Sequence, residues 1–376
     1  MDFDQSWLLL SLPIAFALGW LASRLDFRQL RIENRQAPKA YFRGLNFLLN
    51  EQQDQAIDAF IEAVQNDPDT SELHFALGNL FRRRGEYERA VRVHEHLLSR
   101  GDLTQAERHR AQHALALDFL QAGLLDRAEA ALQKLEGSPF EGQARLALLA
   151  IYERSRDWAN AAQIAQRLQG AGEGDFKSRL AHYLCEQAAT ATPDQALTLL
   201  RQARETAPEA PRPRIDLAAL YERDGQTADA LDALLELARA DNPALPLVAV
   251  RLATQARTCG REAEALTALR SVYEGNPSLD VLEALIILDP AASSRDWYAR
   301  HLEREPSLVA AAKWIAGEKL EHEQFHPQVQ RALDHAVKPL TRYRCAACGF
   351  EATRHFWQCP GCQAWDSYPA RRVEEL

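Results

Sequence analysis

The chain has 376 residues, of which 47% are hydrophobic and 26% charged, and its formal net charge is -9 at pH 7. This length exceeds one ordinary compact domain and is sufficient to bury a sizeable core. The mild negative charge argues against a general nucleic-acid binder, which needs a basic face to neutralise phosphates. Long stretches rich in alanine, leucine, glutamate and arginine, without alternating β-branched residues, predict an all-α protein.

Residues 1–23 are predicted to form an N-terminal transmembrane anchor. After Asp4 this segment has no charged residue, and its apolar run is just long enough to cross a bilayer as a helix. Trp7 and Trp20 lie near the two ends of the run, where indole rings favour the headgroup region. No lysine or arginine precedes the run, so we expect an uncleaved anchor rather than a signal peptide. The basic juxtamembrane segment 24–37 then places the bulk of the chain in the cytoplasm by the positive-inside rule.

Residues 38–277 carry an internal repeat with the period of tetratricopeptide repeats, which is close to 34 residues. Its most regular mark is a small residue that opens the second helix of each unit, with successive spacings of 34, 38, 33, 35, 34 and 35. This residue is an alanine in every unit: Ala56, Ala90, Ala128, Ala161, Ala196, Ala230 and Ala265. Because small residues let antiparallel helices approach closely, we expect about seven helical hairpins stacked into a right-handed solenoid with a concave surface. The pattern fades afterwards, and residues 278–340 are predicted to form a degenerate helical repeat and a cap.

The concave surface is the expected site of partner binding. Asn79, Arg82 and Arg83 lie on the first helix of the second unit, where they are predicted to face the groove. The arginine run Arg82-Arg83-Arg84 there suits an acidic segment or a carboxylate. The alternative is a solvated helix surface, which base rates favour.

The C-terminal residues 341–376 are predicted to form a small metal-binding module. Two C-x-x-C units separated by ten residues supply four candidate ligands: Cys345, Cys348, Cys359 and Cys362. Four thiolates in a tetrahedral set suit one zinc or one iron ion. The module has too few apolar side chains to fold by burial alone, so metal binding should supply its stability.

The residues around the four cysteines fit such a site. Gly349 follows the second cysteine, where the turn requires a positive φ, and Gln363 takes the equivalent place in the second turn. The aromatic residues of the module are predicted to form its small core or to dock it onto the last helices. They are Phe350, Phe356, Trp357, Trp365 and Tyr368.

Other reactive side chains do not point to a second site. Cys185 and Cys259 are lone helical cysteines, which are usually small buried hydrophobes. His182 has helical spacing to Cys185 but lacks a third ligand, and no carboxylate or cysteine completes the pair His109 and His113. Phosphate-binding, nucleophile-elbow and zinc-protease motifs are absent from the sequence, so we expect a protein that is not an enzyme.

The order of anchor, repeats and the tail YRCAACGF…WQCPGCQAW resembles the lipopolysaccharide assembly protein B family (LapB, also called YciM) over essentially the whole chain. In that family the four cysteines are the ligands of a rubredoxin-like metal centre, although the ten-residue spacer here is shorter than in true rubredoxins. The resemblance implies a single-pass inner-membrane protein of Gram-negative bacteria that regulates lipopolysaccharide synthesis from the cytoplasmic side. It also implies partners: the membrane protease FtsH, the deacetylase LpxC as the client for proteolysis, and other inner-membrane lipopolysaccharide assembly proteins.

Two alternative functions remain open at this stage. The four-cysteine centre could transfer electrons while the repeats dock a redox partner. It could also act as a zinc ribbon that docks a partner or a nucleic acid, but the acidic remainder of the chain disfavours a nucleic acid.

Overall fold

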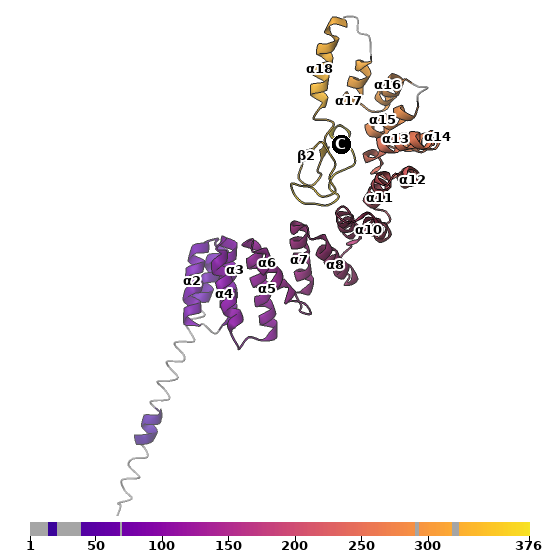
Figure 1. Cartoon of the computed structure of the whole chain (residues 1–376). Coiled ribbons are helices and arrows are strands. Elements are labelled where there is room, and N and C mark those ends of the chain that lie inside the picture. The colour runs from indigo at the N-terminus through magenta and orange to yellow at the C-terminus, as the bar shows by residue number, and fades with distance from the viewer. Residues whose placement is uncertain (1–13, 21–38, 68–69, 290–292, 318–322) are drawn as a thin grey trace, which may run out of the picture. The chain divides into compact units, whose positions relative to one another are not determined.

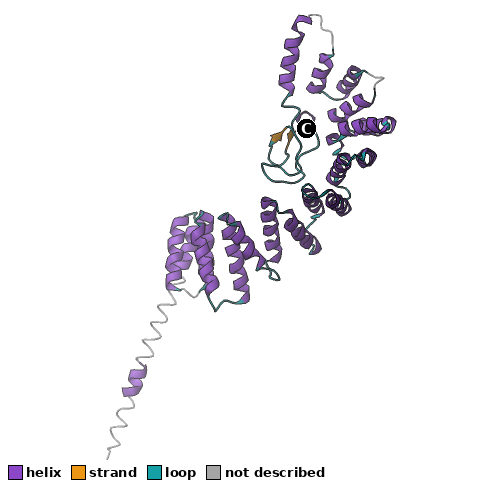
Figure 2. Ribbon diagram, viewed as in Figure 1, coloured by secondary structure: helices purple, strands orange, loops and turns teal. Residues whose placement is uncertain are grey.

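The computed structural model describes residues 14–20, 39–67, 70–289, 293–317 and 323–376. These residues are almost entirely helical, and the chain divides into two compact units, Met1–Ser155 and Arg156–Leu376 (Figures 1 and 2). Most of the predicted anchor 1–23 and the whole basic segment 24–37 lie outside the described residues. Among the residues that are described, no helix is both long and apolar enough to cross a membrane.

The first unit contains paired antiparallel helices. Residues 39–49 are helical, and six further helices follow them in chain order. These are α2 (Gln53–Asn66), α3 (Ser71–Arg84), α4 (Tyr87–Ser99), α5 (Gln105–Gln121), α6 (Leu125–Gln133) and α7 (Glu141–Ser155). Each helix packs against the next, and α3 also packs against α5, so that the first helices of neighbouring hairpins stack.

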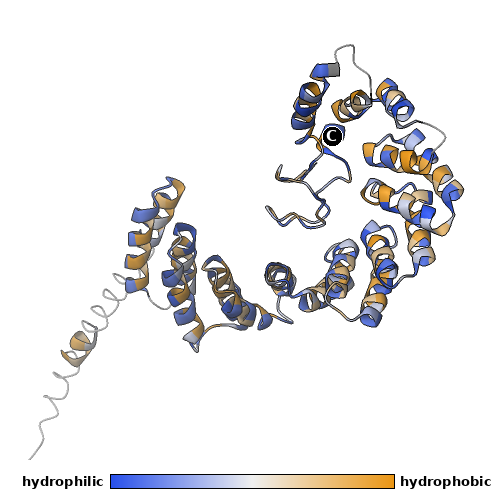
Figure 3. Ribbon diagram, turned by 45° about the horizontal axis from the view of Figure 1, so that its top comes forward, coloured by the Kyte–Doolittle hydropathy of each residue, from blue (hydrophilic) through white to orange (hydrophobic). Residues whose placement is uncertain are grey.

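The second unit continues the same arrangement. Its helices are α8 (Trp158–Gly170), α9 (Lys177–Ala188), α10 (Pro193–Thr206), α11 (Pro211–Arg223), α12 (Thr227–Arg239), α13 (Ala249–Cys259), α14 (Glu262–Gly275), α15 (Leu279–Leu288), α16 (Ser294–Arg304), α17 (Leu308–Ala316) and α18 (His326–Val337). Short 3-10 helices occupy Leu245–Leu247, Glu323–Phe325 and Val373–Glu375, and the strands β1 (Tyr343–Arg344) and β2 (Glu351–Ala352) form an antiparallel pair. The helices of this unit curve round the C-terminal module (Figures 1 and 3).

The repeating alanine has the role that its spacing predicts. All seven of these alanines are at most 2% exposed, and six of them lie on the second helix of a hairpin within one unit. Glycine serves the same purpose on a first helix, because a Cβ atom added to Gly78 would lie 2.5 Å from the His94 ring. Close helix contact therefore depends on small residues at these positions. The prediction of tetratricopeptide-type hairpins from the spacing is confirmed in the described hairpins.

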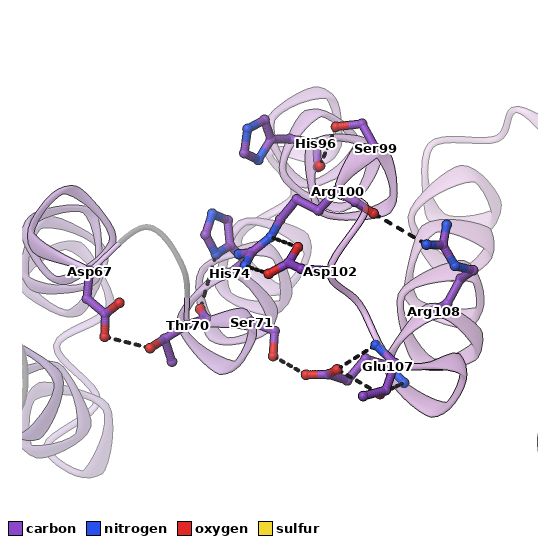
Figure 4. A network of polar contacts seen from close by, with 11 residues as sticks. Asp67, Thr70, Ser71, His74, His96, Ser99, Arg100, Asp102, Glu107 and Arg108 are labelled. Carbon is purple, nitrogen blue, oxygen red and sulfur yellow. Dashed lines mark hydrogen bonds and ion pairs between the residues drawn. The ribbon is translucent and has the colours of Figure 1, made fainter.

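The 38-residue spacing corresponds to a longer connection between α4 and α5. Arg100 pairs with Asp102 in this connection, and Thr104 and Glu107 form a capping box at the start of α5 (Figure 4). Arg108 donates to the Arg100 carbonyl oxygen over 3.3 Å. The inserted residues thus satisfy the polar groups at both helix ends without disturbing the stacking of the hairpins.

The last helices are less regular, as expected for residues 278–340. Helix α15 is buried among the second unit's core residues, whereas α18 has no buried residue. Val329 of α18 is 40% exposed, and Phe325 just before the helix is 55% exposed. Val337 at the end of α18 packs against the second unit's core, while the rest of the helix is more exposed.

Candidate metal centre and its docking surface

The four cysteines occupy two turns of the same construction. The N–H of Gly349 donates to the Cys345 carbonyl over 2.9 Å, and the N–H of Gln363 donates to the Cys359 carbonyl over 2.8 Å. Gly349 has φ 77° and Gln363 has φ 61°, so both positions lie in the left-handed region that the sequence pattern requires. Each turn places two thiols on one side of the backbone, and the two turns face each other.

The sulfur positions fit a tetrahedral metal site. The Cys345 and Cys362 sulfurs are 3.9 Å apart, the Cys348 and Cys359 sulfurs are 3.7 Å apart, and all four lie within 4.8 Å of one another. A Zn–S bond of about 2.3 Å gives sulfur separations of ~3.8 Å around a tetrahedral ion. A disulfide would need about 2.05 Å. The predicted ligands Cys345, Cys348, Cys359 and Cys362 therefore come together as a thiolate set suited to one zinc or iron ion.

Backbone N–H groups stabilise the ionised thiolate form of the cysteines, which is the form that binds a cation. Desolvation opposes ionisation of Cys345, but the Ser367 hydroxyl and the N–H groups of Cys348 and Ala347 outweigh it and lower the Cys345 pKa to about 6. Burial likewise opposes ionisation of Cys359, and two N–H groups of its own turn lower its pKa. The Phe350 N–H favours the Cys348 thiolate, yet desolvation and the neighbouring sulfurs raise the Cys348 pKa to about 12. Complete ionisation therefore requires a bound positive charge.

The core of the module is small. Tyr343 and Tyr368 are 5% and 4% exposed, and they pack with two of the ligands, Cys345 and Cys359. Phe356 is partly buried against this cluster. Since two of its four buried members are metal ligands, the core cannot be complete without the geometry that a bound ion imposes.

The two tryptophans of the module do not belong to this core. Trp365 stacks on His182 of α9, with ring centroids 4.8 Å apart, and meets Trp158 of α8 and Tyr183 edge-on at 5.9 and 5.8 Å. Trp357 lies 5.8 Å from the His182 ring. The module docks as expected: Trp365 meets α8 and α9, and Trp357 also packs against the second unit's core cluster, which extends into the last helices.

A carboxylate completes the contact with α9. Asp366 accepts hydrogen bonds from His182 Nε2 over 2.8 Å and from Ser178 Oγ over 2.9 Å. Partial desolvation works in the opposite direction, but the hydrogen bond from His182 lowers the pKa of Asp366. The aspartate therefore stays ionised and fixes the angle at which the module meets the helix.

Arg212 of α11 also lies at the contact between the module and the helices. It is 7% exposed and donates to Glu186 over 2.7 Å and to Asp216 over 3.3 Å, while its guanidinium lies 6.0 Å from the Trp357 ring. Paired in this way, its charge can be buried next to the aromatic rings of the contact.

The last residues of the chain make a second, separate contact. Arg372 bonds both carboxylate oxygens of Asp280 at 2.9 Å. Glu374 accepts from the Ser307 hydroxyl over 2.8 Å and from the Val309 N–H over 3.1 Å at the start of α17. Glu375 accepts from the Leu279 N–H at the start of α15 over 2.6 Å. We refer to residues 371–376 as the tail. Acidic side chains of the tail thus cap two helix N-termini, where carboxylates are favoured.

The partner-binding residues expected in the first unit form a network within it. Arg82 donates to Asn79 over 2.6 Å and to the buried Asp118 of α5 over 2.9 Å. Asp118 also lies 2.5 Å from Nδ1 of the buried His94 of α4. This network ties three helices together, whereas Arg83 is exposed. Partner binding by Asn79, Arg82 and Arg83 stays a prediction.

Of the docking residues, the sequence indicates Trp357 and Trp365 but not the side chains that they meet. His182 suggests only an incomplete metal ligand, and Ser178, Arg212 and Asp366 carry no motif. The one available signal was Trp365 beside an acidic residue directly after the last C-x-x-C unit. Their meeting depends on the curvature of the helix array, because His182 and Asp366 are 184 positions apart.

Family models match both parts of the architecture. A family model described as the rubredoxin metal binding domain matches residues 343–368, and a tetratricopeptide repeat model matches residues 73–108. A solved tetratricopeptide repeat protein from Parabacteroides merdae is 14% identical, with 68% of this chain and 99% of that chain covered and a TM-score of 0.35.

Two relatives match the chain almost from end to end. Lipopolysaccharide assembly protein B of Haemophilus influenzae is 29% identical, with 96% of each chain covered. The protein of the same name from Escherichia coli strain K12 is 31% identical, with 98% of this chain and 99% of the relative covered. With identity at this level spread over the repeats and the four-cysteine module alike, the chain belongs to the lipopolysaccharide assembly protein B family.

Proposed function

We propose that this protein is a membrane-tethered cytoplasmic adaptor that regulates lipopolysaccharide synthesis. The observation that carries the proposal is the near full-length similarity to relatives named for lipopolysaccharide assembly. The architecture is compatible with it, since stacked helical hairpins offer extended surfaces to other proteins.

The partners in this proposal are the protease FtsH and its client LpxC, as the family resemblance implies. An adaptor needs no reactive centre of its own, because holding a client beside a protease raises their effective concentration. The anchor 1–23, followed by the basic segment 24–37, would hold the repeats 38–277, the cap 278–340 and the module 341–376 at the inner face of the bacterial inner membrane. Residues 14–20 are consistent with an anchor, because Ile14, Phe16, Leu18 and Trp20 are all more than half exposed in the isolated chain.

Measurement of LpxC turnover tests the proposal directly. The chain is expressed in a Gram-negative host depleted of its own lipopolysaccharide assembly protein B, and the half-life of LpxC is followed after synthesis is blocked. We expect a shortened half-life only when both FtsH and this chain are present. An unchanged half-life, with the chain present in the membrane fraction, would remove LpxC from the proposal.

The metal module has its own test in the same host. Cys345→Ser with Cys348→Ser should abolish the effect on LpxC while leaving the chain in the membrane fraction. Cys259→Ser is the matched control, because this half-buried thiol lies outside the four-cysteine cluster. Full activity of the double variant would show that the module has no part in regulation.

A further inference from the structure

The module covers one continuous surface of the second unit, formed by Trp158, Ser178, His182, Tyr183 and Arg212. We call these residues the aromatic face. His182 and Tyr183 are at most 2% exposed with the module in place, and Arg212 is 7% exposed. Buried aromatic and arginine side chains are the residue types that dominate recognition between proteins. The aromatic face therefore has the composition of a recognition surface rather than of a simple helix exterior.

The residues that cover this face are held by the metal-binding turns. Trp357 lies two positions before Cys359, and Trp365 and Asp366 lie three and four positions after Cys362. Asp366 has φ 51°, and its N–H donates to the Trp357 carbonyl over 2.9 Å. The two tryptophans and Asp366 thus lie on short irregular segments, and the conformation of these segments follows from the two thiol turns. Without an ion, the small core of the module is insufficient to stabilise this geometry.

The tail depends on the thiol turns less directly, although Arg372 lies 4.3 Å from the ring of Tyr343 in the module's core. Its contacts to Asp280, Ser307 and the start of α15 come from residues 371–376, well beyond the last ligand. A module that has lost its metal would therefore remain attached to the second unit at the tail while leaving the aromatic face.

We infer that metal binding controls access to a recognition surface on α8, α9 and α11: the metal-bound module covers the aromatic face, and loss of the metal uncovers it. The uncovered face fits a partner segment with the chemistry that the module itself supplies, an aromatic ring next to a carboxylate. This inference builds on the proposed adaptor function, because it names a surface that such an adaptor exposes in one metal state only.

Hydroxyl-radical footprinting of the purified full-length chain in detergent tests the inference, with side-chain oxidation read by mass spectrometry. The metal-loaded chain is compared with the chain stripped by a chelator and with the variant Cys345→Ser with Cys348→Ser. We expect oxidation of His182 and Tyr183 to rise at least fivefold on metal loss and to return on adding Zn2+ to the stripped wild type. Tyr273 and Trp297 are internal references, because both are buried in the second unit, at 4% and 6% exposure, and their described aromatic contacts are with each other and with His301.

A second variant separates uncovering from loss of the module's own fold. Trp365→Ala with Asp366→Ala keeps all four thiols and should still bind one Zn2+ per chain, yet it should expose His182 and Tyr183 in the presence of the metal. Arg354→Gln is the matched control, since this exposed residue of the module makes its described contact with Phe356 and not with α9.

Two results would overturn the inference. One is unchanged protection of His182 and Tyr183 in the stripped chain, which would mean that docking needs no metal. The other is an equal rise at Tyr273 and Trp297, which would mean that the helices themselves unfold. Because footprinting uses neither FtsH nor LpxC, its outcome is independent of the turnover assay.

Discussion

At the scale of single residues, the two thiol turns show how far a local rule specifies a site. Gly349 and Gln363 occupy equivalent positions with φ 77° and 61°, and only one of them is a glycine. A side chain in the left-handed region costs about 1 kcal/mol, so the second turn carries strain that the first does not. This difference is readable from the sequence, because the position after each C-x-x-C unit is defined by the turn. The module as a whole tolerates the strain since the ion stabilises both turns together.

Separate substitutions at these two positions should change metal affinity in opposite directions. Gln363→Gly should strengthen Zn2+ binding by about 1 kcal/mol, which is roughly fivefold, because the strain in the second turn is relieved. Gly349→Ala should weaken binding by a similar amount, since no atom lies within 4 Å of the added Cβ and only the backbone is strained. Competition with a chromogenic chelator measures both. Equal affinities in the two variants would contradict this account of the turns.

At the scale of elements, the helix pairs follow from one repeating contact. A single alanine, buried at every one of seven recurrences, sets the distance between the helices of a hairpin. That regularity made the hairpins and the four-residue insertion predictable, because both depend on interactions between residues close in sequence. The docking of the module was only partly predictable. Trp365 and Asp366 were visible in the sequence, but their partner α9 is defined by how many hairpins separate the two and by how the array curves.

Enlarging a hairpin alanine should destabilise the second unit. Ala230→Leu adds a branched side chain at a position with 0% exposure on α12, and overpacking of this kind costs about 1–3 kcal/mol. Ala228→Leu is the matched control, because Ala228 is exposed on the same helix and should change the stability by less than about 0.5 kcal/mol. Urea unfolding followed by circular dichroism compares the two. Similar midpoints for both variants would show that close helix approach does not depend on residue 230.

The tail contact should contribute measurable stability to α17. Glu374→Gln removes the negative charge that accepts from the Ser307 hydroxyl and the Val309 N–H, with an expected loss of about 1 kcal/mol. Hydrogen exchange at the first turn of α17 should rise about fivefold. Glu303→Gln, on the exposed side of α16, serves as the control and should leave that exchange rate unchanged. No difference between the two variants would mean that the tail only rests against the helix.

At the scale of the whole molecule, the metal module and the polar network of the first unit act on different parts of the chain. The metal module contacts the second unit through the aromatic face and the tail, so it is attached at two places. The first unit carries its own polar network through Arg82 and Asp118, which does not involve the module. In the proposed function the anchor sets where the chain acts, and the module sets which surface the second unit presents. Position and recognition can then be altered separately.

Replacement of the anchor tests this separation. A chain in which residues 1–23 are exchanged for an unrelated single-pass helix of the same orientation should shorten the LpxC half-life as the wild type does, because tethering acts through effective concentration. A chain that begins at residue 39 should be soluble and folded, yet it should lose most of the effect at matched expression. Fractionation of membranes and the half-life of LpxC measure the two properties in the same cells. If the exchanged helix is membrane-bound but inactive, the native anchor must contact a partner helix directly, and tethering alone is then an insufficient description of its role.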